Sequence, residues 1–303
     1  MRIVSLLPSA TEILYALGAG PDVVGVTFEC DEPARARTDA RVVSTSSLPT
    51  AAEGAAPTPA EIDAAVRARL AAGEDLSHLD RDALATLGAD LVVTPDLCAV
   101  CAVDVGEVRD ALDYLGCTAQ VLTTDPHTIG QILDSIVAVG TACGREQPAA
   151  DLVADLRARL AVLPGAPVPG GRRVAVLEWT DPPFAPGHWV PEMVEVAGGT
   201  SVLGSAGAKS LPTTWPDIAA ARPEIVVVAP CGFDLETSAR LTAELLDGPL
   251  ADLPGVEQVW AVDANASYAR PGPRIVDGTE ALAAVVDPDR WGAPDPAIAR
   301  RCR

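Results

Sequence analysis

The chain has 303 residues, of which 49 % are hydrophobic and 21 % are charged. This composition excludes an intrinsically disordered chain, and the length is sufficient for two domains that each bury a core. The net charge of −20 argues against nucleic acid and anionic lipid surfaces as partners, because their phosphates would be repelled.

The amino-terminal sequence MRIVSLLPSATEIL enters a strand-like run directly. It has no basic segment followed by an apolar stretch and a small-residue cleavage site, and no cysteine of the lipid-attachment type. The chain also lacks a run of about 18 apolar residues, so we expect no membrane span. We therefore expect a cytoplasmic protein whose seven cysteines are reduced.

Hydrophobic runs and helix-boundary residues predict βα units in the first half of the chain. Strands are expected at residues 2–7, 23–26, 91–93 and 119–122. A helix that Ser9 could cap follows the first strand and closes at Gly18 and Gly20, and another helix runs from Pro59 towards Leu70.

Residues 126–162 show a helical spacing of apolar residues and no strand pattern, which fits either a pair of surface helices or a long connector. The segment PGAPVPGG ends this region. A second series of elements follows, with strands at residues 173–177, 225–228 and 259–262 and helices at residues 191–196 and 278–286.

Two stretches repeat a helix, a buried strand and a cysteine-bearing loop: LATLGADLVVTPDLCAVC and IAAARPEIVVVAPCGFDLE. In an open α/β sheet, the loops at the carboxyl ends of parallel strands line the ligand crevice. The repeat therefore predicts two similar lobes that direct thiol-bearing loops at a shared cleft.

Four cysteines follow predicted strands and could share one metal site: Cys30, Cys98, Cys101 and Cys231. Cys98 and Cys101 have a spacing that can chelate one metal, and two further thiolates would complete a zinc site or hold an iron–sulfur cluster. Small buried core residues and redox-active thiols are the alternatives, and the sequence leaves all three open.

The loop from Glu178 to Trp189 concentrates aromatic rings in a chain that is only 4 % aromatic. Trp179, Phe184 and Trp189, together with three prolines, predict a stiff apolar wall that suits a large planar ligand such as a tetrapyrrole. His188 could ligate a corrin cobalt or a haem iron through its neutral imidazole. In the alternative interpretation the tryptophans are structural and His188 caps the following helix.

Six further candidate ligand contacts are Ser9, Phe28, Glu29, Tyr268, Arg270 and Arg274. The last three join the final strand to the final helix, where guanidinium groups suit a carboxylate or amide on the ligand. Arg274 could instead pair with Asp277 at the surface.

Signatures of common enzyme classes are missing from the sequence. No Gly-x-Gly-x-x-Gly follows a strand and no Walker loop occurs, so nucleotide cofactors are not expected. The serine elbow of hydrolases is missing as well. Of the three histidines, His78 and His127 lie in polar contexts that offer little to a hydrolytic triad. We expect a binding protein rather than an enzyme.

Four segments carry a resemblance to a known family: RIVSLLPSATEILYALGAG, DLVVTPDLCAVCAV, HWVPEMVEVAGG and RPGPRIVDGTEAL. They are similar to the substrate-binding proteins that deliver vitamin B12 and iron chelates to ABC importers, and in particular to the BtuF-like cobalamin-binding branch. The resemblance covers nearly the whole chain, although the cysteine loops are not part of the B12-transport pattern.

The resemblance implies a class III periplasmic binding protein fold of the α/β class. Two Rossmann-like lobes, residues 1–125 and 172–303, would be joined by a long helical connector, residues 126–171, with the ligand cleft between them. By motif match, Glu192 is the candidate residue that docks an ABC permease.

The leading functional hypothesis is therefore a non-enzymatic binding protein for a corrinoid or a related metal chelate, acting as a carrier or sensor. The alternative is a cytoplasmic metalloprotein or redox enzyme with a cysteine-ligated metal or iron–sulfur cluster in its cleft.

Overall fold

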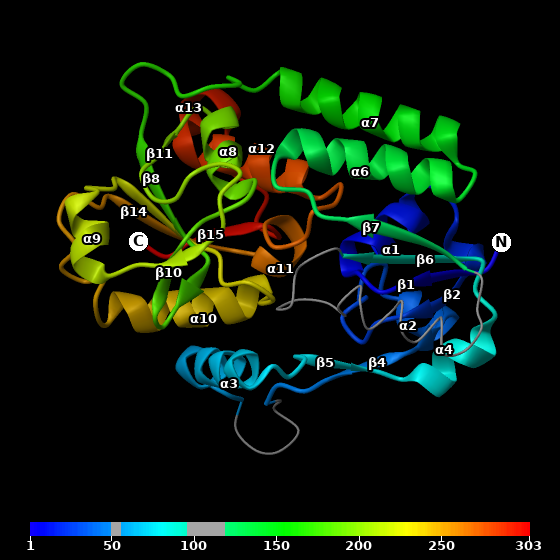
Figure 1. Cartoon of the computed structure of the whole chain (residues 1–303). Coiled ribbons are helices and arrows are strands. Elements are labelled where there is room, and N and C mark those ends of the chain that lie inside the picture. The colour runs from blue at the N-terminus through cyan, green and yellow to red at the C-terminus, as the bar shows by residue number, and fades with distance from the viewer. Residues whose placement is uncertain (50–55, 96–118) are drawn as a thin grey trace. The chain divides into compact units, whose positions relative to one another are not determined.

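The computed structural model describes residues 1–49, 56–95 and 119–303 (Figure 1). The chain divides into two compact units. The N-terminal unit comprises Met1–Asp125 and Leu133–Val153, and the C-terminal unit comprises Pro126–Ile132 and Ala154–Arg303. Each unit has its own mainly parallel sheet and helices, which confirms the predicted α/β class.

The first half of the chain alternates strands and helices. Its elements are β1 (Ile3–Ser5), α1 (Pro8–Ala16), η1 (Gly20–Asp22), β2 (Val23–Val26), α2 (Ala36–Asp39), β3 (Arg41–Val42), β4 (Ser44–Ser46), α3 (Pro59–Ala72), β5 (Ser77–Leu79), α4 (Arg81–Leu87), β6 (Leu91–Pro95) and β7 (Gln120–Thr124). The segment from residue 126 then forms two helices, α6 (Ile129–Ala142) and α7 (Glu146–Ala161).

Five parallel strands form the sheet of the N-terminal unit, in the order β3-β2-β1-β6-β7. The first strand lies in the middle, since Ser5 pairs with Val26 on one side and with Val93 on the other. All of β1 is buried, as expected for a parallel strand covered on both faces. The strand order reverses between β1 and β6, so their carboxyl ends form a topological switch point.

Helix α1 begins at Pro8, with Leu7 as its N-cap and no side-chain capping bond. Proline suits the first helical turn because its fixed φ is helical and its missing N–H has no helical acceptor there. The predicted cap, Ser9, lies inside the helix and is buried, so that prediction was wrong. The predicted end is confirmed: the helix stops before Gly18, whose φ of +74° is left-handed.

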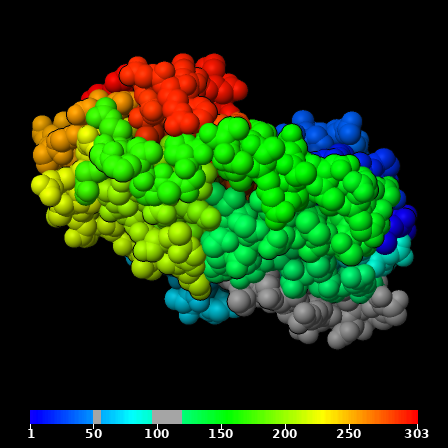
Figure 2. All heavy atoms as spheres, turned by 90° about the horizontal axis from the view of Figure 1, so that it is seen from above, coloured from blue at the N-terminus to red at the C-terminus, as the bar shows by residue number. Residues whose placement is uncertain are grey.

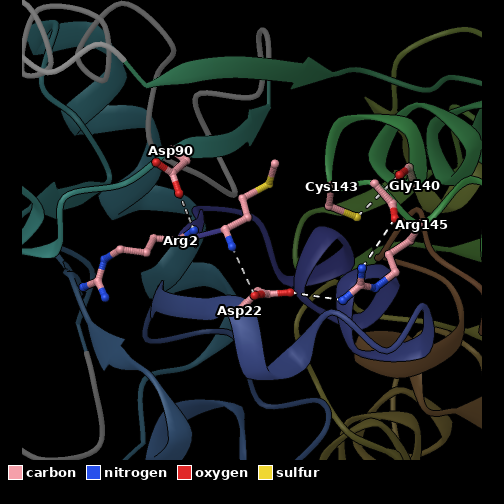
Figure 3. A network of polar contacts seen from close by, with 8 residues as sticks. Arg2, Asp22, Asp90, Gly140, Cys143 and Arg145 are labelled. Carbon is pink, nitrogen blue, oxygen red and sulfur yellow. Dashed lines mark hydrogen bonds and ion pairs between the residues drawn. The ribbon is translucent and has the colours of Figure 1, made fainter.

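Asp22 joins two distant segments of the N-terminal unit (Figure 3). Its carboxylate lies 3.4 Å from the amino-terminal nitrogen of Met1 and 3.2 Å from the Arg145 guanidinium. Beside this contact, the backbone N–H of Arg2 donates to Asp90 Oδ2 at 2.7 Å. Partly exposed ion pairs of this kind are each worth about 0–1 kcal/mol, so they mainly orient the turn between α6 and α7.

Helices α6 and α7 pack closely at Gly140. A Cβ at this position would overlap the Cβ of Ala149 and would lie 3.1 Å from the Arg145 carbonyl oxygen. Glycine therefore permits an approach that no other residue would. Helix α7 lies at the surface (Figure 2), with Ala149, Val153 and Leu156 among its buried residues.

The C-terminal unit contains the remaining elements. They are β8 (Arg173–Leu177), β9 (Trp179–Thr180), β10 (Pro183–Ala185), α8 (Val190–Val196), β11 (Thr200–Ser201), β12 (Leu211–Pro212), α9 (Trp215–Ala220), β13 (Ile225–Val228), α10 (Leu235–Leu246), β14 (Gln258–Val262), α11 (Ala264–Ser267), α12 (Ile275–Val286), α13 (Pro288–Trp291) and β15 (Ala299–Arg301). Within the described parts of the chain, no helix combines the length and apolar character needed to cross a bilayer.

The main sheet of the C-terminal unit has the order β11-β8-β13-β14-β15. Its first four strands are parallel, and β15 is antiparallel at the edge. The strand order reverses between β8 and β13, which gives this unit a switch point as well. A small antiparallel sheet, β12-β10-β9, follows β8 along the chain.

Each main sheet carries a cluster of buried apolar side chains. In the N-terminal unit the cluster includes Val4, Leu6, Val43, Leu79, Leu84 and Val92. In the C-terminal unit it includes Ala175, Leu177, Ile218, Val226, Val228, Leu250 and Val259. Burying such a side chain contributes roughly 1.5–3 kcal/mol, so these clusters fix the positions of the strand ends.

Replacing Gly140 with alanine should lower the free energy of unfolding, although alanine is the better helix former. The added methyl group would meet Ala149 and a backbone carbonyl, and overpacking of this kind costs about 1–3 kcal/mol. Denaturant unfolding followed by circular dichroism measures the loss.

Two variants control this experiment. In Gly130→Ala, on the same helix, the nearest atom to the new Cβ would be Thr128 Oγ1 at 3.8 Å, so the change should be neutral or slightly stabilising. Ala149→Gly should by itself cost about 1 kcal/mol, so the double variant Gly140→Ala/Ala149→Gly should lose less than the sum of the two single losses. Additive losses would contradict the close-packing argument.

Candidate ligand-binding site

The candidate site lies at the switch point of the C-terminal unit. Strands β8 and β13 are paired so that Leu177 lies beside Val228, and the chain leaves both strands at the same edge. Open α/β sheets bind ligands outside the carboxyl ends of their strands at such a point. The residues that follow the two strands include Glu178, Trp179, Cys231 and Phe233.

Trp179 and Phe233 stack at this edge, with ring centres 5.6 Å apart and planes inclined by 21°. Both residues are half-buried. The backbone supports the stack, because the Cys231 N–H donates to the Glu178 carbonyl oxygen at 3.0 Å. Phe184 on β10 lies opposite Trp179 in the small antiparallel sheet. The structure thus brings the predicted residues Trp179 and Phe184 together and adds Phe233.

The Glu178 carboxyl group links two loops. Its Oε1 accepts a hydrogen bond from the Gly187 N–H at 3.2 Å, and its Oε2 accepts one from the Ser210 hydroxyl. Burial raises the pKa of Glu178 to about 6, although both hydrogen bonds favour the charged form. One carboxyl group therefore connects the loop after β10 to the segment that enters β12.

Two glycines let these loops approach each other. A Cβ on Gly187 would overlap the backbone nitrogen of Ser210, and one on Gly204 would overlap the Pro186 carbonyl oxygen. Gly204 also has a left-handed φ of +70°. Side chains at these positions would push the loops apart, so the contact of Glu178 with both loops depends on the two glycines.

Two histidines of the C-terminal unit come together beside these loops. The ring centres of His127 and His188 are 5.1 Å apart, and the ring planes are inclined by 69°. Trp189, not His188, is the N-cap of α8, and that end has no side-chain capping bond. The alternative in which His188 caps this helix is therefore wrong. His188 has a left-handed backbone, with φ of 51°.

Trp189 and Tyr268 belong to the buried interior. Trp189 is 8 % exposed, and its Nε1 donates to the Tyr268 carbonyl oxygen at 2.8 Å. Tyr268 is 2 % exposed, and burial raises the pKa of its phenol. Either side chain would have to become exposed before it could contact a ligand. For Trp189, the interpretation as a structural residue therefore fits better than the interpretation as a ligand contact.

Arg270 and Arg274 lie near Asp263, which directly follows β14. Burial raises the pKa of Asp263, while a backbone N–H and the charges of Arg274 and Arg270 lower it. Arg270 is buried and Arg274 is half-buried. Asp277, the predicted surface partner of Arg274, contacts Arg159 at 2.5 Å. Two cations thus lie close to the carboxyl end of β14.

Cys30 lies inside a buried polar cluster of the N-terminal unit. Its Sγ accepts a hydrogen bond from the Thr11 hydroxyl at 3.0 Å and lies 3.1 Å from the Thr27 hydroxyl. Of the three predicted ligand contacts in this unit, Ser9 is buried, and Phe28 and Glu29 are half-buried. Their contact with a ligand stays a prediction.

No group of three or more Cys, His, Asp or Glu side chains that could hold a metal ion occurs among the residues that the structure describes. Cys98 and Cys101 lie outside the described residues, so a metal site built on their thiolates stays a prediction. Cys30 is buried, whereas Cys231 is exposed in the loop after β13. Neither Cys30 nor Cys231 therefore belongs to a group of metal-ligating side chains among the described residues.

Glu192, the predicted docking residue, lies on α8 and is half-buried. Its Oε2 accepts a hydrogen bond from the backbone N–H of Ile129 at 2.8 Å. Because Ile129 is the first residue of α6, the carboxylate satisfies an open helical N–H group and complements the positive end of the helix dipole. Glu192 therefore has a structural role within the chain, and its contact with a permease stays a prediction.

Three residues of this region were not predicted as site residues: Glu178, Phe233 and His127. The first two could have been found, because they follow the predicted strands 173–177 and 225–228 at a carboxyl edge. His127 gave no such signal, since it lies in a polar segment just ahead of a helix.

Solved structures of similar fold include a periplasmic heme-binding protein from Pseudomonas aeruginosa. It matches with a TM-score of 0.68 and 18 % identity, over 98 % of this chain and 96 % of that one. The periplasmic vitamin B12-binding protein BtuF of Vibrio cholerae matches with a TM-score of 0.63 and 20 % identity, over 94 % and 96 %. An ABC transporter substrate-binding protein from Listeria monocytogenes matches with a TM-score of 0.65 and 15 % identity, over 94 % and 98 %.

These similarities confirm that the chain has the class III periplasmic binding protein fold that the sequence motifs predicted. Neither the protein-family models nor the curated proteins gave a match to the sequence.

Glu178 should make the free energy of unfolding depend on pH. Its pKa of about 6 in the folded chain exceeds the ordinary value of 4.5, so the folded state binds the proton more tightly. The resulting stabilisation is complete below pH 4.5 and is lost as the pH rises through 6. A Glu178→Gln variant lacks this titration, and its stability relative to the parent chain should rise by about 1–2 kcal/mol between pH 4.5 and 7.

Denaturant unfolding at a series of pH values measures this difference. A Glu195→Gln variant on α8 controls for the loss of a carboxylate elsewhere in the same unit. Parallel pH curves for Glu178→Gln and the parent chain would exclude the raised pKa.

Brief treatment of the native protein with N-ethylmaleimide should label Cys231 and spare Cys30 and Cys143. Cys231 is exposed and the other two are buried. Burial also raises the pKa of the Cys143 thiol, which lowers its reactive thiolate fraction. Peptide mass mapping measures the labelling, with the unfolded protein as the fully labelled control. Equal labelling of Cys30 and Cys231 in the native protein would contradict these placements.

Proposed function

We propose that the chain is a substrate-binding protein of the ABC-importer type that binds a corrinoid or another tetrapyrrole chelate. The ligand contacts the switch-point edge of the C-terminal unit. The observation that carries the proposal is the stack of Trp179 on Phe233 at this edge, where an open α/β sheet binds its ligand. The fold supports it, because proteins of this fold include ones that bind vitamin B12 and heme.

A tetrapyrrole presents a large flat face that matches the aromatic side chains. Trp179, Phe184 and Phe233 are all half-buried, so each keeps part of its surface accessible. Aromatic pairs contribute about 0.5–1.5 kcal/mol beyond the area that they bury. Several rings at one edge therefore favour a flat conjugated ligand over a small polar one.

The polar rim of a tetrapyrrole matches the nearby arginines. Guanidinium groups donate to carboxylates and to amide oxygens, and these are the groups that surround haem and corrin rings. The net charge of −20 would repel an anionic ligand, but at physiological ionic strength distant charges are screened beyond about 8 Å. The half-buried Arg274 would therefore contact the ligand rim, and the buried Arg270 would add only its charge nearby.

The partner in this proposal is an ABC permease, with Glu192 as the docking residue. Two features support it: the sequence motif around Glu192, and a fold shared with an ABC transporter substrate-binding protein. A cytoplasmic chain would use the same site as a carrier or sensor of the chelate. Cell fractionation distinguishes a protein that serves a permease from a cytoplasmic carrier or sensor. The proposed ligand is the same in both cases.

Cyanocobalamin and haemin should each be titrated against the protein, with absorbance and tryptophan fluorescence as readouts. We expect micromolar or tighter binding of at least one of them. Trp179→Ala and Phe233→Ala should each weaken that binding by roughly ten-fold, which corresponds to about 1.4 kcal/mol.

Trp291→Ala is the matched control, because it removes a tryptophan of the same unit from α13, which is outside the segments that follow β8 and β13. Its affinity should equal that of the parent chain. Binding no tighter than millimolar for both ligands, or equal losses in the control and in Trp179→Ala, would refute the proposal.

A further inference from the structure

The two histidine rings of the C-terminal unit are spaced as in a shared metal site. A zinc–nitrogen bond is about 2.0–2.1 Å long, so two imidazoles on one tetrahedral ion have ring centres roughly 5 Å apart. The ring centres of His127 and His188 are 5.1 Å apart. Both residues are half-buried, so solvent ions can reach them.

One short turn holds both histidines in place. The Gly207 carbonyl oxygen lies 3.4 Å from His127 Nδ1. The Gly207 N–H donates to the His188 carbonyl oxygen at 2.8 Å, and the His188 N–H donates to the Ala208 carbonyl oxygen at 2.6 Å. The same two residues, Gly207 and Ala208, therefore contact the ring of one histidine and hold the backbone of the other.

We propose that His127 and His188 form a binding site for one divalent cation of the Zn²⁺, Ni²⁺ or Cu²⁺ class. Imidazole nitrogen suits these ions better than it suits Mg²⁺ or Ca²⁺. A metal-ligating histidine usually donates its other ring N–H to a backbone carbonyl or carboxylate, and the Gly207 carbonyl takes this place beside His127 Nδ1.

Two imidazoles leave further coordination positions of the ion to water or to donor atoms of a bound molecule. The site goes beyond the proposed function, because it binds the ion whether or not a tetrapyrrole is present. It also differs from the predicted cysteine site, since it uses no thiolate.

Isothermal titration calorimetry with NiCl₂ tests the proposal, on full-length protein whose accessible thiols are blocked with N-ethylmaleimide. We expect one Ni²⁺ per chain. His127→Gln and His188→Asn should each weaken binding at least ten-fold. Asparagine is chosen at position 188 because it tolerates the left-handed backbone of this residue. His78→Gln, at the remaining histidine of the three, is the matched control and should keep full affinity.

Electron paramagnetic resonance of the parent protein with one equivalent of Cu²⁺ gives a readout that needs no variant. Coupling to two imidazole nitrogens is expected. No Ni²⁺ binding by the parent chain, undiminished affinity in His127→Gln or His188→Asn, or a Cu²⁺ spectrum without two imidazole nitrogens overturns the site. Ni²⁺ binding by a parent chain that binds neither cyanocobalamin nor haemin supports the site and refutes only the proposed function.

Discussion

The pairing of β8 with β13 is the constraint on which the candidate site depends. The two strands end level, with Val228 beside Leu177, and both residues are fully buried. A shift of one residue would move the following segment by about 3.3 Å. That distance would break the bond between the Cys231 N–H and the Glu178 carbonyl and would separate the Trp179 and Phe233 rings. The apolar core therefore sets the geometry of a polar and aromatic edge that contributes little to the core itself.

Glu178 shows how this edge organises the loops beyond it. A buried carboxyl group is costly in its charged form unless it is hydrogen-bonded. Here the backbone N–H of Gly187 and the hydroxyl of Ser210 supply the hydrogen bonds, and each comes from a different loop. The need to satisfy one carboxyl group therefore holds both loops against the strand end. Glycine at positions 187 and 204 makes the arrangement possible, because a Cβ at either would overlap backbone atoms.

The sequence predicted the strands well and the site only in part. Strands at residues 23–26, 173–177 and 225–228 were predicted with the bounds that the structure shows, because buried parallel strands are short unbroken apolar runs. The cap of the first helix was wrong, since Pro8 rather than Ser9 determines where that helix begins. The site residues were harder to predict, because only the tertiary structure brings His127 close to His188 and Phe233 close to Trp179. Hydrophobic periodicity reports burial, and it carries no information on which half-buried polar residues meet.

The left-handed backbone of His188 is explained by the same arrangement. A non-glycine residue in this region costs roughly 1–2 kcal/mol per residue relative to a right-handed one. Two backbone hydrogen bonds to Gly207 and Ala208 offset that cost, and Gly207 itself has a left-handed φ of +76°. The residue before His188 is Gly187, whose N–H donates to Glu178. His188 is therefore held by its own bonds to Gly207 and Ala208 and, through Gly187, by Glu178. A backbone fixed in this way loses little further entropy when the residue meets a ligand or an ion, so the strain at His188 favours a preformed site over a flexible loop.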